Sequence, residues 1–228
     1  VVLIGLQHFL QAYQYDGLDT CAACGLCSVA CPVGINTGDL TRQLRHRHNT
    51  RYESRASWIG DHFSGVTRAA KIGLAMADSA HAVLGAGAVE GVSGGLNKLS
   101  DGRIPKWHRY MPKPAGRIPL THSAPRDAPR VVYLPSCGTR TLGTARGDSE
   151  HDDLMTKNFS LLRKAGYQVI LPEGLSGLCC GMAFHSKGLF DEAERKSQAL
   201  RQALNHASNN GEYPIYCDTS PCLMRMKE

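Results

Sequence analysis

Apolar and polar residues follow a helical pattern in the first part of this chain. An apolar run with helical spacing opens the chain and predicts a helix over residues 1–15. Residues 17–36 are rich in Gly and contain a Pro, and they predict a loop. Thr37 is the candidate N-cap of a following helix over about residues 38–48. The chain is therefore expected to begin with a helix, a loop and a second helix.

Small residues dominate the next stretch, residues 55–99, which predicts one or two helices that pack closely. Gly85 and the pair Gly94 and Gly95 are the expected breaks. Six prolines then lie within residues 101–129. Because proline has no backbone N–H and a fixed φ, this density predicts a linker without regular secondary structure that ends at a domain boundary near residue 129.

The pattern changes in the last part of the chain. Short apolar runs predict strands over residues 131–134, 167–171 and 213–217. Apolar residues at helical spacing predict helices over residues 149–165 and 188–207 between these strands. This alternation of strands and helices predicts a small parallel sheet.

The size and apolar content of the chain allow a buried core, since 42% of its 228 residues are apolar. No uncharged apolar run reaches the roughly 18–20 residues that a membrane helix needs. No Lys or Arg precedes Arg42, so a secretory signal is not expected and the expected location is the cytoplasm. The chain opens at Val1 in mid-pattern, which suggests a piece of a longer or processed protein.

Positive charge is concentrated in the middle of the chain. Of the 26 Lys and Arg residues, 15 lie within residues 42–130, together with only six of the 20 acidic residues. Arg42, Arg45 and Arg47 spread charge around one predicted helix, which is therefore expected to be exposed on one side. The whole segment is either a solvated face with a basic linker, or a surface for an anionic partner or for lipid headgroups at the inner face of the membrane. Nucleic acid is not an expected partner, because no recognition motif is present.

Cysteine is the most informative residue type, and the chain has nine. An odd number, tight clustering and the absence of a secretory signal favour metal or redox chemistry over a disulfide framework. The cysteines form two groups along the sequence. The N-terminal cysteine group is Cys21, Cys24, Cys27 and Cys31, and the C-terminal cysteine group is Cys137, Cys179, Cys180, Cys217 and Cys222.

The N-terminal cysteine group has the spacing of a ferredoxin-type iron–sulfur motif, C-x2-C-x2-C-x3-C-P. Thiolates separated by two residues can hold corners of one 4Fe-4S cluster while the backbone N–H groups between them point at its sulfides. Gly25 permits a close backbone approach, and Pro32 turns the chain away after the last thiolate. Zinc is the alternative, although structural zinc sites usually pair two cysteines with two distant ligands.

The last cysteine of this group leaves two arrangements open. In two-cluster ferredoxins the fourth cysteine of each run ligates the other cluster. Cys31 therefore either completes a single cluster or serves a second cluster whose own cysteine run lies upstream of Val1. Iron analysis of the intact parent protein distinguishes them, with about four iron atoms in this module for one cluster and about eight for two.

These observations predict an α-helical, ferredoxin-like cluster domain over residues 1–54, followed by a small α/β domain with a parallel sheet over residues 130–228. Residues 55–129 are predicted to be small-residue helices and a Pro-rich basic linker. The α/β domain is expected to be truncated.

The C-terminal cysteine group follows the predicted strands. Cys137 comes after the first predicted strand, and the adjacent Cys179 and Cys180 come after the second. Cys217 is the last residue of the third predicted strand, and Cys222 follows that strand. Because the carboxyl ends of parallel strands meet at one edge of a sheet, these cysteines are expected to converge there. Two adjacent cysteines suit a larger or irregular cluster better than a zinc tetrahedron. The alternative is that some of them, Cys217 above all, are buried or incidental thiols.

The strings around these cysteines resemble a known family. Cys137, Cys179-Cys180-Gly181 and Cys222 resemble the cysteine-rich CCG domain of heterodisulfide reductase and glycolate oxidase iron–sulfur subunits. Longer strings are similar to the C-terminal half of bacterial FAD- and iron–sulfur-containing D-lactate dehydrogenases. These strings are YDGLDTC from Tyr15, CPVGINTGDL from Cys31, LPSC from Leu134, PEGLSGLCCGM from Pro172 and DTSPC from Asp218.

The resemblance implies an oxidoreductase module. In that family a flavin domain, which this chain lacks, uses FAD to take a hydride from a D-2-hydroxy acid, and iron–sulfur centres pass electrons singly to a quinone or a cytochrome. The implied partners are the flavin domain of the same parent chain or a flavin subunit, and the quinone or cytochrome acceptor. The fragment alone is expected to be inactive on hydroxy acids. The implied ligands of a second iron–sulfur or metal centre are Cys137, Cys179, Cys180 and Cys222.

One position departs from the family pattern. The CCG pattern usually ends in C-x-x-C, but Thr219 stands at the first of these positions, and Cys217 is the nearby substitute. The second site therefore holds either a full irregular cluster or a reduced or metal-free version. Two alternatives to electron transfer also stay open: thiol–disulfide redox catalysis at the CCG site, and a zinc-bound structural module.

Overall fold

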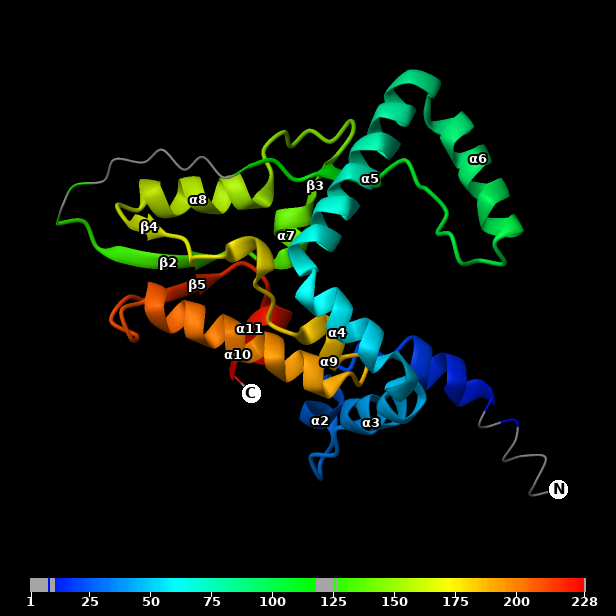
Figure 1. Ribbon diagram of the computed structural model, residues 1–228, viewed down its shortest axis with the longest axis horizontal. Coiled ribbons are helices and arrows are strands. Elements are labelled where there is room, and N and C mark those ends of the chain that lie inside the picture. The colour runs from blue at the N-terminus through cyan, green and yellow to red at the C-terminus, as the bar shows by residue number, and fades with distance from the viewer. Residues whose placement is uncertain (1–7, 9–10, 118–124, 126, 228) are drawn as a thin grey trace. The chain divides into compact units, whose positions relative to one another are not determined.

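The computed structural model describes residue 8 and residues 11–117, 125 and 127–227, and it is mostly helical with two small sheets (Figure 1). The chain divides into two compact units, each built from segments that are distant in sequence. The first unit draws on Val1–Asp61, Cys179–Arg201 and Ser220–Glu228, and the second unit on His62–Leu178 and Gln202–Thr219.

The first unit is helical. The predicted helix over residues 1–15 lies mostly outside the described residues, and the π-helix η1 (Gln14–Asp19) continues beyond its expected end. The predicted loop contains a short helix, α2 (Leu26–Ala30), that the pattern did not indicate. The remaining elements of this unit are α3 (Thr37–Asn49), η2 (Thr50–Tyr52), α4 (Glu53–Asp61), α9 (Met182–His185), the first part of α10 (Phe190–Ala207), and α11 (Ser220–Lys227).

Helix α3 confirms the helix predicted over residues 38–48 to within one residue at each end. Its cap is Asn36 rather than Thr37, which corrects the prediction. Asn36 has an extended backbone, and its Oδ1 accepts a 3.0 Å hydrogen bond from Gly38 N, whereas Thr37 is already part of the helix. Asparagine is as good a cap as threonine, because its side-chain oxygen reaches the same unpaired N–H groups.

The second unit contains the predicted parallel sheet. Its strand order is β4 (Gln168–Ile170), β2 (Arg130–Leu134), β5 (Ile215–Cys217), and both outer strands run parallel to β2. Tyr133 of the central strand lies opposite Tyr216. All residues of β2 after the first are buried, which explains why this strand has a continuous apolar run without alternation.

Helix α8 (Leu154–Lys164) packs beside β4, and Met155 and Phe159 on this helix form the core of the unit with Tyr133. Gly166 follows the helix with φ +87°, as predicted for a helix-ending glycine. The predicted start at residue 149 is wrong by five residues. The preceding Asp153 instead accepts backbone N–H groups from two other segments.

A two-stranded sheet corrects the prediction for residues 101–129. Strand β1 (Pro112–Pro114) pairs antiparallel with β3 (Leu142–Ala145), which the short helix α7 (Cys137–Thr141) connects to β2. Proline is tolerated in β1 because this is an edge strand, where a missing N–H needs no partner.

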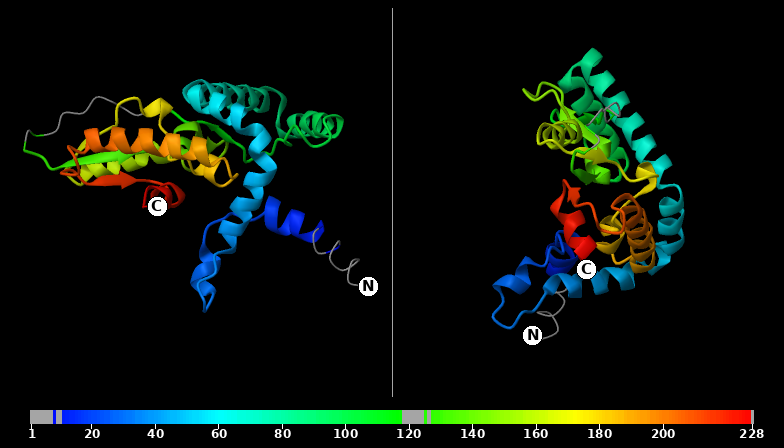
Figure 2. Two further views of the ribbon diagram at one scale, coloured as in Figure 1. Left: turned by 60° about the horizontal axis from the view of Figure 1, so that its bottom comes forward. Right: turned by 90° about the vertical axis from the view of Figure 1, so that its left-hand side faces the viewer.

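Residues 55–99 are helical as predicted, but the chain forms three helices there, with α5 (Phe63–Leu84) and α6 (Ala86–Leu99) making a hairpin in the second unit (Figure 2). Gly85, with φ +78°, breaks the two helices as predicted, whereas Gly94 and Gly95 lie inside α6. Close packing is not observed: a Cβ at either glycine would meet no atom within 4 Å. Among the described helices, none has both the length and the apolarity needed to cross a bilayer.

Candidate metal centres

The N-terminal cysteine group lies on one loop of the first unit. Cys21 and Cys24 precede α2, Cys27 lies in its first turn, and Cys31 follows its last residue. Gly25, immediately before the helix, has φ +77°, a left-handed conformation that glycine adopts without strain. The spacing of the motif is therefore realised as an irregular segment followed by a single short helix.

Gly38 brings the N-terminus of α3 against this loop. A Cβ added at Gly38 would lie 3.1 Å from Ala23 Cα, closer than ordinary van der Waals contact. Ala23 is itself buried and has a positive φ of +50°. A glycine at the start of α3 therefore allows the helix terminus to reach the backbone of the cysteine loop.

Two arginines of α3 hold the loop from within the protein. The guanidinium of Arg45 donates hydrogen bonds of 2.6–2.7 Å to three backbone carbonyl oxygens, those of Leu18, Cys21 and Ser186. Arg42 donates to Ala23 O at 3.0 Å. Both side chains are buried, so Arg42 and Arg45 do not belong to a solvated basic face. The exposed Arg47 agrees with the prediction that this helix is exposed on one side. Burial is tolerated because the charged N–H groups have acceptors.

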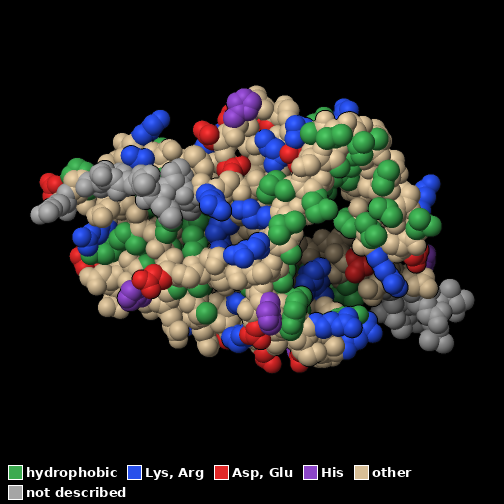
Figure 3. All heavy atoms as spheres, turned by 45° about the horizontal axis from the view of Figure 1, so that its top comes forward, with side chains coloured by type: hydrophobic (Ala, Val, Ile, Leu, Met, Phe, Trp, Pro, Cys, Tyr) green, Lys and Arg blue, Asp and Glu red, His purple; other side chains and the backbone are tan. Residues whose placement is uncertain are grey.

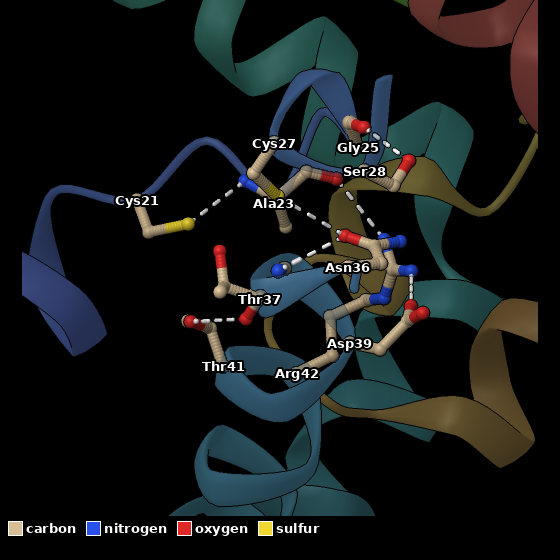
Figure 4. Close-up of polar contacts among 11 residues, drawn as sticks. Cys21, Ala23, Gly25, Cys27, Ser28, Asn36, Thr37, Asp39, Thr41 and Arg42 are labelled. Carbon is tan, nitrogen blue, oxygen red and sulfur yellow. Dashed lines mark hydrogen bonds and ion pairs between the residues drawn. The ribbon is translucent and has the colours of Figure 1, made fainter. Parts of the chain in front are cut away.

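Polar groups approach two sulfur atoms of the loop (Figure 4). Ala23 N donates to Cys21 Sγ at 3.3 Å, and the Cys27 thiol donates to Asn36 Oδ1 at 3.5 Å. The same Asn36 oxygen caps α3 by accepting from Gly38 N. The helix terminus and the cysteine loop therefore share one polar network.

Two thiols of the loop ionise more readily than an ordinary cysteine. The pKa of Cys27 is lowered, chiefly by a hydrogen bond from the Thr37 side chain and next by one from the backbone N–H of Gly38. The pKa of Cys31 is also lowered, chiefly by the backbone N–H of Ile35. A lowered pKa favours the thiolate, which is the form that ligates a metal.

The four thiols of the N-terminal cysteine group do not converge on one point in the structure. Across the described residues, no three Cys, His, Asp or Glu side chains are placed so that they could hold a metal ion, and Cys24 is exposed. The donor chemistry fits an iron–sulfur cluster, because two thiols have lowered pKa values and the sulfur of Cys21 accepts a backbone N–H. The residues that would hold such a cluster are Cys21, Cys24, Cys27 and Cys31.

Three cysteines of the C-terminal group lie in the first unit, and all three are buried. The sulfur atoms of Cys180 and Cys222 are 3.3 Å apart, although 42 residues separate them in sequence. Gly181 N donates to Cys179 Sγ at 3.4 Å. Hydrogen bonds from Cys179 and then Cys222 lower the pKa of Cys180. All nine cysteines lie in the described part of the chain, and none forms a disulfide.

Glycine is required beside this cysteine pair. Gly181 has φ +81°, and an added Cβ would lie 2.3 Å from the carbonyl oxygen of Ala193 in α10. No side chain fits in that distance, so the backbone of the cysteine pair can lie against α10 only with glycine at this position. The sequence places a glycine after the cysteine pair but does not indicate which segment lies against it.

The other two cysteines of the C-terminal group belong to the second unit. Cys137 is half-buried and begins α7, where the Ser136 hydroxyl caps the helix by accepting from Thr139 N at 3.0 Å. Cys217 is half-buried at the end of β5, and its thiol donates to Thr219 O at 3.7 Å. The predicted ligand set of the second site is therefore divided between the two units.

Sequence reasoning missed a polar junction in the second unit that links the LPSC and DTSPC strings. Asp218 Oδ1 accepts from Ser136 N at 2.9 Å, and Asp218 Oδ2 accepts from Tyr133 Oη at 3.0 Å. The hydroxyl of Thr219 also donates to Asp218 Oδ1, at 2.9 Å. This set of contacts, the Asp218 junction, ties the end of β2 to the end of β5. An aspartate directly after a predicted strand was the available signal.

Comparison of the chain with protein-family models, curated proteins and solved structures finds no match. Function is therefore inferred from the cysteine sites and their surroundings.

Proposed function

We propose that this chain is an iron–sulfur electron-transfer module of an FAD-dependent D-2-hydroxy acid dehydrogenase similar to the D-lactate enzymes. A 4Fe-4S cluster, when bound, supplies one-electron transfer between the flavin of the upstream part or subunit and a quinone or cytochrome. The N-terminal cysteine group holds it in a ferredoxin-like cluster segment. The predicted ligands Cys137, Cys179, Cys180 and Cys222 provide a second iron–sulfur or metal centre as a further relay. The parent enzyme is cytoplasmic in this proposal.

The main support for the proposal is the ferredoxin-type spacing of four cysteines on a loop whose sulfur atoms accept hydrogen bonds. Ala23 N donates to Cys21 Sγ, and the pKa values of Cys27 and Cys31 are lowered by neighbouring donors. Hydrogen bonds to cysteine sulfur are one of the factors that set the potential of an iron–sulfur cluster. Arg45 binds the Leu18 and Cys21 carbonyls at the start of this loop and joins them to Ser186, which limits the rearrangement of the ligands during electron transfer.

Anaerobic reconstitution with iron and sulfide tests this proposal. Relative to the original chain, Cys27→Ser is expected to bind about four fewer iron atoms and to lose the visible absorbance and the EPR signal of a reduced cluster. The matched control is Cys217→Ser, which is expected to keep them. Zinc bound without visible absorbance would instead identify a structural zinc module, and a chain that binds no metal would refute the proposal.

A second candidate function, thiol–disulfide redox catalysis, is favoured by the 3.3 Å separation of the Cys180 and Cys222 sulfur atoms. In this chemistry the Cys180 sulfur attacks a disulfide R–S–S–R′ and releases R′S⁻, forming a mixed disulfide. Cys222 then attacks the Cys180 sulfur and releases RS⁻, so that two protein thiols are oxidised to a disulfide and the substrate is reduced by two electrons. Both thiols are buried, which restricts access and ranks this candidate second.

Two measurements separate catalysis from relay. Oxidised glutathione added to the reduced chain should produce a Cys180–Cys222 disulfide and two molecules of glutathione, detectable by mass spectrometry, if the pair is catalytic. In the iron-loaded and oxidised protein, an EPR signal that appears only on addition of a thiol would also indicate catalysis. If neither the disulfide nor the thiol-dependent EPR signal is detected, electron transfer is the favoured function.

We also propose that the α5–α6 hairpin contacts the inner face of the membrane. Seven of its large apolar side chains are exposed, and Figure 3 shows hydrophobic side chains gathered over this hairpin at the upper right. Residues 62–117 carry eight Lys and Arg residues but only three acids. Apolar side chains next to positive charge suit a bilayer with anionic lipids, where a quinone acceptor dissolves. The seven side chains are Ile72, Met76, Val83, Leu84, Val92, Leu96 and Leu99.

A further inference from the structure

A cavity of about 840 Å³ lies within the second unit, between one face of α5, the end of β1 and helix α7. This volume is in the range of sites that hold small organic molecules, roughly 300–1,000 Å³. Part of its lining is apolar and comes from α5, from α8 and from the segment that follows β4. These apolar residues are Ile72, Met155, Leu171 and Leu175.

The charged part of the lining is entirely basic. Arg68 and Lys71 on α5, Arg117 beyond β1 and Arg140 on α7 line the cavity, and no acidic residue is among the described residues around it. Within the part of the chain that the structure describes, Arg68, Lys71 and Arg117 form no ion pair with a carboxylate. Lys71 is also half-buried, which reduces the screening of its charge by water.

Three acids lie close in sequence to this lining, namely Asp78, Asp153 and the exposed Glu173. Asp78 of α5 forms a 2.7 Å ion pair with Arg146. The carboxylate of Asp153 accepts the backbone N–H groups of Gly116 and Thr144. The neutral N–H donors leave the negative charge of Asp153 in place beside Gly116 of the lining, so this carboxylate offsets part of the positive charge of the four basic residues.

One of the basic side chains of the lining, that of Arg140, is also held in place. The guanidinium of Arg140 donates hydrogen bonds to the backbone carbonyl oxygens of Leu175 and Leu178, the second at 2.5 Å. These neutral acceptors orient the guanidinium and fix the segment that follows β4 against α7. The cavity therefore has at least one cation whose position is set before any ligand arrives.

We propose that this cavity binds an organic anion, a carboxylate or a phosphate monoester carried on an apolar body. The negative head group balances Lys71 and Arg117, and the apolar body covers Ile72 and Met155. A small inorganic anion leaves the apolar lining in water, and a neutral apolar ligand desolvates the cations without giving them a partner. The site does not depend on iron, so it goes beyond the electron-transfer role.

Isothermal titration calorimetry with octanoate and octyl phosphate tests the site, with octanamide as the neutral isostere and inorganic phosphate as the bare anion. At least one of the two organic anions is expected to bind one-to-one and about tenfold more tightly than octanamide or inorganic phosphate, a ratio that corresponds to about 1.4 kcal/mol. The affinity is expected to fall with added salt, because the attraction is partly electrostatic.

Substitutions of the basic residues that line the cavity test whether the anion binds there. Lys71→Met and Arg117→Gln are each expected to weaken the binding of the organic anion about five- to tenfold, whereas Lys71→Arg is expected to keep it. The matched control is Lys98→Met, which removes a charge from α6 outside the cavity. Thermal unfolding of each variant checks that the chain remains folded.

Equal affinity for octanoate, octyl phosphate and octanamide, no binding of either anion, or an equal loss in Lys71→Met and Lys98→Met would overturn the proposal. Vesicles of phosphatidic acid, whose head group is a phosphate monoester, separate two sources of the same head-group chemistry. Vesicles that displace the bound anion from the original chain identify a lipid head group as the ligand, and a lack of displacement identifies a water-soluble anion. Because calorimetry needs no cluster, a negative result leaves the electron-transfer proposal intact.

Discussion

The hydroxyl of Tyr133 donates a 3.0 Å hydrogen bond to Asp218 Oδ2, from a side chain that is completely buried. The Tyr133 ring packs with Met155 and Phe159 in the core of the second unit. The other oxygen of Asp218 accepts the backbone N–H of Ser136. One tyrosine therefore joins the apolar core to the junction that holds the two cysteine-containing strings.

Removing this hydroxyl should destabilise the protein without disturbing the core. Tyr133→Phe keeps the ring but deletes one of the donors to Asp218, so we expect the free energy of unfolding to fall by about 1–2 kcal/mol in urea denaturation. Tyr110→Phe is the matched control, because the Tyr110 side chain is 69% exposed, and its effect should stay within about 0.5 kcal/mol. Equal effects of the two changes would show that the Tyr133–Asp218 bond contributes little.

Tyr133 should also make the protein sensitive to alkali. Its pKa is raised well above the usual range, chiefly by burial and next by the negative charge of Asp218. An unfolded tyrosine ionises near pH 10, so above about pH 10 the unfolded state binds fewer protons than the native state. Stability is therefore fully present below about pH 10 and decreases as the pH rises further. Urea midpoints measured up to pH 11 should decline less in Tyr133→Phe, and parallel declines would contradict this assignment.

Arg45 should determine whether the cysteine loop retains iron. Lysine has one ammonium in place of the guanidinium fork, so Arg45→Lys cannot keep three carbonyl partners in the same directions. We expect a loss of about 2 kcal/mol in the stability of the metal-free chain and a lower iron content after reconstitution. Arg47→Lys, at an exposed position on the same helix, is the control. Full iron retention in Arg45→Lys would mean that the three hydrogen bonds of Arg45 are not needed to hold the cluster.

Alanine at position 181 should disturb the buried cysteine pair. Gly181→Ala places a Cβ 2.3 Å from Ala193 O and forces a positive φ on alanine, which should cost about 2–4 kcal/mol. Gly177→Ala is the control, since a Cβ there would meet no atom within 4 Å. Urea denaturation gives the stability, and alkylation by iodoacetamide should become faster at Cys179 and Cys180 only in the first variant.

Acidic residues on the hairpin should release the protein from anionic membranes. Replacing both Val92 and Leu96 by Asp removes two exposed apolar side chains and adds negative charge. Binding to phosphatidylglycerol vesicles in a flotation assay is expected to weaken at least about tenfold. Leu161→Asp, on α8 and 61% exposed, is the control. Unchanged flotation, or self-association that these changes abolish, would indicate that the hairpin contacts protein instead of lipid.

The sequence predicted those features that depend on local pattern. The sheet was predictable because a strand buried on both faces, such as β2, has a continuous apolar run. Gly85 and Gly166 were predictable as helix ends because their positive φ angles suit glycine. The cap of α3 was misplaced by one residue, since Asn36 and Thr37 are both able to cap a helix.

The pattern failed where distant residues supply the partners. Arg42 and Arg45 look like solvated charges on a helix, but carbonyl oxygens from the cysteine loop, and from Ser186 far along the chain, allow them to be buried. Strand β1 was missed because its prolines argue against a strand unless an edge is available.

The sequence by itself determined the chemistry that this chain can offer: nine cysteines, the ferredoxin-type spacing of four of them, and glycine beside the adjacent pair. Only the tertiary structure decided that the sulfur atoms of Cys180 and Cys222 are in contact, that Cys137 belongs to a different unit, and that Gly181 lies against Ala193. Ligand type and short spacing are properties of the covalent chain. Contact between residues far apart in sequence is set by the packing of helices and strands, which no local pattern specifies.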